Sequence, residues 1–137
     1  KDGDIYVKEY HSQLVDTHGF KVYIVNGEAV RNYVEDLLRS MPKSEALAQE
    51  YTIWIEGGNG YKYPFIPKDE IWLDAKLKSF ELDKTLIHEY TESMLMKDGM
   101  SYDDAHKRAT KAEYEFADKR HLMAVAFKKA QNGNTPE

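Results

Sequence analysis

Two long helical patterns joined by a short turn constrain the fold of this chain more than any other sequence feature. The first pattern covers residues 80–97, and Ser79 is suited to cap its start. The second covers residues 102–130 and begins with a capping pattern at Ser101. Gly99 can stop the first helix because glycine readily adopts the left-handed backbone conformation. Since the connection is short, we expect the two helices to lie side by side and antiparallel.

Strand-like segments lie upstream of these helices and are rich in β-branched and aromatic residues. Strands are expected at residues 20–25, 51–55, 61–65 and 71–74. Residues 28–39 carry apolar side chains at helical spacing, which predicts an amphipathic helix, and the glycine-rich residues 57–60 predict a loop. This order of elements predicts an α+β fold, in which a small, mostly antiparallel sheet packs on two long C-terminal helices.

The chain has a suitable length for one domain. Its 137 residues and its 42% hydrophobic composition predict a single domain over residues 1–137. Residues 1–18 are polar and are expected to form a short helix or an extended N-terminal arm. Residues 131–137 are expected to form a flexible tail.

Charge and cysteine content narrow the classes of function. The net charge of −5 disfavours a surface for nucleic acid or for an anionic membrane. The absence of cysteine excludes thiolate catalysis, cysteine-type zinc sites and disulfides. No apolar run approaches the length of a membrane span, and no signal peptide is visible, so a cytoplasmic location is the expectation.

Metal-ligating side chains are concentrated on the two predicted C-terminal helices. His88 and Glu92 lie one helical turn apart, so both can reach one ion, and Glu89 is rotated by about 100° from His88. His106 and Glu113 share one side of the second helix. Two imidazoles with one or two carboxylates suit Zn²⁺, with Fe²⁺ and Mn²⁺ as rivals. The predicted ligands are His88, Glu92 and His106, with Glu113 as a fourth ligand or as the residue that orients His106.

A simpler interpretation of the same residues stays open. Acidic side chains on a helix are often just solvated, and His88 could be a core histidine bonded to a tyrosine or an aspartate. Tyr90, Tyr102 and Tyr114 are each candidates to donate a hydrogen bond to an oxyanion, and core packing is the alternative for all three.

One part of the sequence resembles the zincin metallopeptidases. It is the predicted helix with Leu86-Ile87-His88-Glu89, which follows the predicted strand Ile71-Trp72-Leu73-Asp74. This resemblance implies that His88 is the first zinc ligand and that Glu89 is the general base on a metal-bound water. It also implies that Ile71, Trp72 and Leu73 form a sheet edge that holds an extended peptide. Glu92 stands where the zincins have a second histidine. A carboxylate there still binds zinc, but its negative charge weakens the metal as an electrophile.

The wider pattern is similar to an uncharacterised group of small bacterial and phage-encoded domains, through residues 19–27, 64–74 and 88–113. That group carries no secure activity to transfer. The leading interpretation is therefore a zinc-dependent hydrolase of the peptidase type that acts on a peptide or protein. One alternative is a catalytically inactive zincin-like binding module of phage or mobile-element origin. The other is a carboxylate-rich dimetal protein, although such sites normally draw ligands from four helices.

Overall fold

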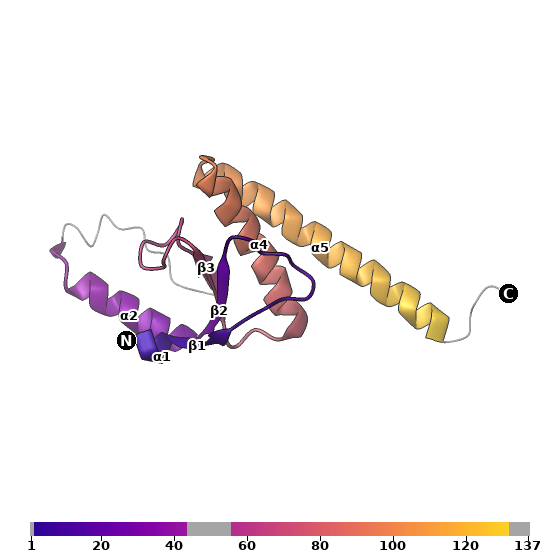
Figure 1. Cartoon of the computed structure of the whole chain (residues 1–137), viewed down its shortest axis with the longest axis horizontal. Coiled ribbons are helices and arrows are strands. Elements are labelled where there is room, and N and C mark those ends of the chain that lie inside the picture. The colour runs from indigo at the N-terminus through magenta and orange to yellow at the C-terminus, as the bar shows by residue number, and fades with distance from the viewer. Residues whose placement is uncertain (1, 44–55, 132–137) are drawn as a thin grey trace.

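The computed structural model describes residues 2–43 and 56–131, which form a small sheet and several helices (Figure 1). In chain order, the elements are α1 (Asp2–Ile5), β1 (Tyr6–Glu9), β2 (Lys21–Val25), α2 (Gly27–Arg39), β3 (Gly57–Asn59), β4 (Glu70–Asp74), α4 (Ser79–Lys97) and α5 (Tyr102–Gln131). The strand order is β1-β2-β4-β3, and every pair is antiparallel except the parallel pair β2–β4. The predicted α+β fold, with a mostly antiparallel sheet and two long C-terminal helices, is confirmed.

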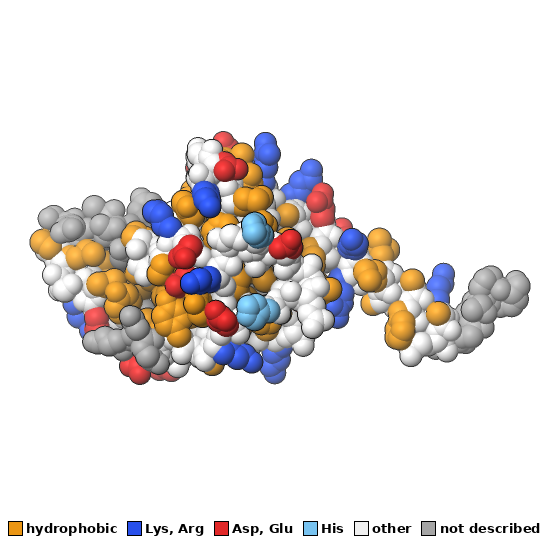
Figure 2. All heavy atoms as spheres, in the orientation of Figure 1, with side chains coloured by type: hydrophobic (Ala, Val, Ile, Leu, Met, Phe, Trp, Pro, Cys, Tyr) orange, Lys and Arg blue, Asp and Glu red, His pale blue; other side chains and the backbone are white. Residues whose placement is uncertain are grey.

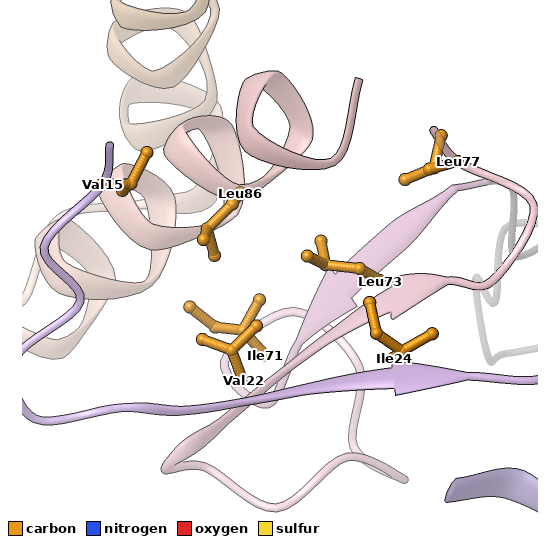
Figure 3. Close-up of a cluster of buried hydrophobic side chains, with 7 residues drawn as sticks. All are labelled: Val15, Val22, Ile24, Ile71, Leu73, Leu77 and Leu86. Carbon is orange, nitrogen blue, oxygen red and sulfur yellow. The ribbon is translucent and has the colours of Figure 1, made fainter. Parts of the chain in front are cut away.

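The sheet is covered by helices on both faces, because alternate strand residues point to opposite sides. Val22 and Ile24 of β2 and Leu73 of β4 pack with Leu86 of α4, in the cluster that Figure 3 shows. On the other face, Val25 and Trp72 pack with Val30 of α2. The sheet therefore positions α4 from one side while α2 closes the other side.

Helices α4 and α5 form the antiparallel pair that the short turn predicts. Gly99 has a φ of +106°, and the Met100 N–H donates to the Leu95 carbonyl at 3.0 Å, so the chain reverses directly after α4. The fully buried Ala105 and Ala109 permit close approach of the helices. Near the other end, the rings of Phe80 and Phe116 stack with their centroids 5.5 Å apart.

The N-terminal segment belongs to the sheet. After α1, strand β1 pairs with β2, and the loop that follows is tied to α4. The hydroxyls of Tyr10 and Ser12 both donate to Oδ1 of Asp83, at 2.7 and 2.8 Å. The segment predicted as a short helix or an extended arm thus contains a short helix and an edge strand.

Strand positions differ from the sequence predictions in three places. The predicted edge strand is wrong: β4 pairs with β2 on one side and β3 on the other, and Ile71, Trp72 and Leu73 are almost fully buried. Residues 61–65, predicted as a strand, form turns, whereas Gly57–Asn59, predicted as part of a loop, forms β3. The strand predicted at residues 51–55 lies outside the described residues.

The helix boundaries agree closely with the sequence patterns. Helix α5 runs to Gln131, and the rest of the predicted tail lies outside the described residues. Helix α4 begins at Ser79, preceded by Lys78 as the capping residue, so the predicted capping role of Ser79 is wrong by one position. None of the helices in residues 2–43 and 56–131 combines the length and the apolar character needed to cross a bilayer.

Candidate metal centre

Three side chains converge where α4 and α5 face each other. One potential ligand atom from each of His88, Glu92 and His106 lies within 4.8 Å of the others. Helix α4 supplies His88 and Glu92 one turn apart, and α5 supplies His106 from the facing side. Glu92 is 1% exposed, so it is not a solvated helix-surface charge. The predicted three-residue group is therefore brought together by the fold.

The distances within this group suit a small cation. Oε2 of Glu92 lies 3.3 Å from Nε2 of His88 and 2.8 Å from Nδ1 of His106. Ligand atoms placed tetrahedrally about zinc lie about 3.3 Å from one another. Small side-chain rotations would thus turn a hydrogen-bonded cluster into a coordination shell. The His106 side chain is 46% exposed, which opens the centre to solvent on the α5 side.

Glu113 contacts His88 rather than His106. Its Oε1 lies 2.9 Å from Nδ1 of His88, and the Lys84 ammonium lies 3.8 Å from its other oxygen. A carboxylate accepts, so His88 donates through Nδ1–H to Glu113, while its Nε2 faces Glu92 and would lose its proton to bind an ion. This is the usual arrangement of a histidine ligand and its orienting carboxylate. The prediction that Glu113 orients His106 is wrong, and Glu113 lies outside the three-residue group.

Glu89 is buried beside this group, on the side of the sheet. Its Oε1 accepts a hydrogen bond of 2.9 Å from Nδ2 of Asn59, and its backbone carbonyl accepts one from Ser93. Burial, and then the negative charge of Glu92, raise the pKa of Glu89 to about 7. A carboxylate with a pKa near neutrality is suited to take up and release a proton at physiological pH.

Asn59 is a site residue that the sequence prediction missed. It lies at the end of β3, is fully buried, and donates through Nδ2 to both Glu89 and Glu92, at 2.9 and 3.1 Å. Its Oδ1 accepts from the backbone N–H groups of Tyr61 and Lys62. The sequence signals only a turn at this glycine-rich position, so the link to α4 could not be recognised there.

A lysine and a tyrosine form a second layer next to His106. Nζ of Lys62 donates to the Tyr102 hydroxyl at 2.8 Å, and this hydroxyl lies 3.2 Å from Nδ1 of His106. Burial alone would lower the pKa of Lys62, but its hydrogen bond to Tyr102, and then the nearby Tyr63 and Glu92, raise it. Of the three tyrosines considered as oxyanion donors, Tyr102 is the one that contacts the group. Tyr114 is 62% exposed, and Tyr90 packs against Phe20.

The charges of this group balance one another. Burial opposes ionisation of Glu92, but hydrogen bonds from His88 and His106 outweigh burial and lower the Glu92 pKa. Burial likewise opposes a positive charge on His88, but the neighbouring carboxylates have a larger effect than burial and raise the His88 pKa. The centre therefore combines a buried carboxylate, two imidazoles and access to solvent.

Comparisons with protein-family models, with curated proteins and with solved structures gave no match for this chain. The resemblance to the zincins and to the small bacterial and phage-encoded domains stays a prediction. Among the residues that the structure describes, one group of three or more histidine and acidic side chains has metal-binding spacing. The proposed function therefore rests on that group.

Proposed function

We propose that this protein is a zinc-dependent hydrolase of the peptidase type, with His88, Glu92 and His106 as the metal ligands. The observation that supports this proposal is the convergence of two imidazoles and one buried carboxylate within 4.8 Å. Such a donor set suits Zn²⁺, with Fe²⁺ and Mn²⁺ as rivals. Three protein ligands leave a fourth position for water, as hydrolysis requires.

The surrounding residues have roles that fit this chemistry. When bound, zinc would act as a Lewis acid and lower the pKa of a coordinated water. Glu89 would accept the proton, since its own pKa of about 7 lets it exist in both forms near neutral pH. Asn59 offsets the repulsion between the Glu89 and Glu92 carboxylates by donating a hydrogen bond to each.

The exposure of the residues around the centre indicates the side from which a substrate would approach. Strand β4 is paired on both sides and buried, so Ile71, Trp72 and Leu73 have no free edge on which a peptide could lie. The half-exposed His106 leaves the α5 side as the accessible side of the centre. A peptide or protein substrate would therefore reach the metal past His106 and Tyr102.

Metal binding is the first test of the proposal. Protein purified without chelator and reconstituted with zinc should hold a single zinc ion per chain by elemental analysis, and His88→Ala should hold none. His121→Ala is the matched control, because His121 is exposed on α5 outside the group. Equal zinc in the wild type and His88→Ala would defeat the metal site. Two ions per chain would favour the dimetal alternative.

Hydrolysis is the second test. The zinc-loaded wild type should cleave members of a peptide library, and Glu89→Gln should retain zinc and fold but lose cleavage. The amide introduced by Glu89→Gln keeps an acceptor oxygen for Asn59, so the substitution removes the base with little change in packing. A zinc-loaded wild type that cleaves nothing would refute the hydrolase and favour the inactive binding module.

A further inference from the structure

The distal segment of α5, residues 119–131, extends past the start of α4 (Figure 1). The guanidinium of Arg120 lies 5.0 Å from the ring centroid of Phe80, which is in the first turn of α4. The start of α4 is therefore level with Arg120, and the later residues of α5 extend past it. Figure 2 shows hydrophobic side chains along the projecting part of the helix. The exposed ones are Leu122 (67%), Met123 (62%), Val125 (44%) and Phe127 (64%). Such a concentration of exposed apolar side chains indicates an interaction surface.

Two of these side chains continue the seam between α4 and α5. Ala105, Ala109 and Phe116 are the α5 residues that pack towards α4. Met123 follows Phe116 by seven residues and Phe127 follows Met123 by four, so both lie on the same side of the helix as Phe116. The apolar side of α5 that packs on α4 therefore continues beyond the start of α4. Its apolar residues there are seven and four positions apart, which is the spacing of residues that pack against another helix.

The charges of the distal segment define the partner. Lys119 and Arg120 stand before the apolar residues, Lys128 and Lys129 stand after them, and residues 119–131 contain no acidic residue. The chain as a whole has a net charge of −5, so this segment is basic within an acidic protein. A second copy would set basic ends against basic ends in either orientation, which costs free energy. An acidic helix would pair with both ends.

We propose that the distal segment of α5 is a docking site for an acidic amphipathic helix of a partner protein. The apolar side of that helix would cover Met123 and Phe127 and extend the line of α4 along α5. Its acidic side chains would pair with Arg120 at one end and with Lys128 and Lys129 at the other. The basic residues stand at the two ends of the apolar run rather than along one polar face, so a partner helix fits better than a membrane surface.

Fluorescence anisotropy with a designed probe tests this proposal on the full chain. The probe is a labelled helical peptide with leucines at heptad spacing and glutamates beside them. The matched peptide carries lysines in place of the glutamates. The wild type should bind the acidic peptide and not the basic one. Met123→Glu and Phe127→Glu should each weaken binding at least about tenfold, or about 1.4 kcal/mol. Tyr114→Glu should not, because Tyr114 is equally exposed but lies outside the segment.

Each other outcome overturns the proposal. If the acidic peptide does not bind, or if the two peptides bind equally, charge does not select the partner and the acidic-helix proposal is refuted. A wild type that is dimeric by light scattering, and monomeric as Met123→Glu, would assign the surface to a second copy of this chain. Binding to vesicles of phosphatidylserine and phosphatidylcholine without binding to the acidic peptide would assign it to a membrane. Because these substitutions lie on an exposed helix, circular dichroism should show the wild-type fold for all of them.

Discussion

The buried side chains of Asn59 and Glu92 are joined by a hydrogen bond of 3.1 Å, although 33 residues separate them in the sequence. The same amide nitrogen donates to Glu89 at 2.9 Å. One side chain of β3 therefore satisfies two carboxylates of α4 that would otherwise repel each other. The sheet and the candidate metal centre are coupled at this point.

Asn59→Ala should destabilise the fold and weaken zinc binding together. The substitution leaves buried oxygens of Glu89 and Glu92 without a donor, which costs about 1–3 kcal/mol. Urea unfolding in the presence of a chelator measures the first effect, and competition with a chromophoric zinc chelator measures the second. Ser12→Ala also removes a hydrogen bond to α4, but at Asp83, and should lower stability with unchanged zinc affinity. If Asn59→Ala leaves zinc affinity intact, Asn59 has only a structural role.

Glu113→Gln should lower zinc affinity about 10–100-fold without preventing folding. Residues that orient a histidine ligand have effects of this size, and Glu113 contacts Nδ1 of His88 at 2.9 Å. Zinc titration against a competing chelator gives the affinity. Glu115→Gln is the matched control, since Glu115 is exposed on the same helix. Equal affinities for the two variants would contradict the orienting role of Glu113.

The helices and the three-residue candidate metal group could be predicted from the sequence, since both depend on local spacing. Apolar periodicity indicated the extents of α4 and α5, and the turn at Gly99 required them to be antiparallel. Once they are antiparallel, Glu92 and His106 must face each other near the turn. The same geometry places Glu113, seven residues after His106, opposite an earlier position of α4. That position is His88, so the partner of Glu113 was also predictable.

The order of strands could not be predicted in the same way, because strand pairing joins segments that are distant in the sequence. Residues 71–73 are apolar at every position, which is typical of a strand buried on both faces. This signal favoured an interior strand, whereas the resemblance to the zincins implied an edge, and the interior position is the one observed. Asn59 was missed for a related reason: its partners Glu89 and Glu92 lie in an element far along the chain.

Alkaline pH should destabilise the protein partly through Tyr10. Burial, and then Asp83, raise the pKa of Tyr10 to about 12 in the folded state, compared with about 10 in the unfolded chain. Folding favours the neutral phenol, so this contribution is fully present below pH 10 and is lost as the pH rises towards 12. Thermal unfolding from pH 9 to 12 should show a steeper loss of stability for the wild type than for Tyr10→Phe. Tyr114→Phe, at an exposed position, should follow the wild type.

Gly60 should be intolerant of a side chain because it holds the turn after Asn59. A Cβ at Gly60 would clash with the carbonyl oxygen of Pro67, a backbone atom that cannot rotate away. Gly60→Ala should therefore destabilise the fold by about 1–3 kcal/mol, the usual cost of overpacking. It should also weaken zinc binding, since Asn59 would move with the turn.

Gly99→Ala is the control that separates the loss of stability from the loss of zinc affinity expected for Gly60→Ala. Gly99 has a φ of +106°, but a Cβ added there would meet no atom within 4 Å, so its substitution costs only backbone strain of about 1–2 kcal/mol. Both variants should lose stability in urea, and Gly60→Ala alone should lose zinc affinity in the chelator competition. Equal zinc affinities at matched stability would show that the turn after Asn59 does not support the metal centre. A loss of affinity confined to Gly60→Ala would tie the coordination geometry to the close contact between Gly60 and Pro67.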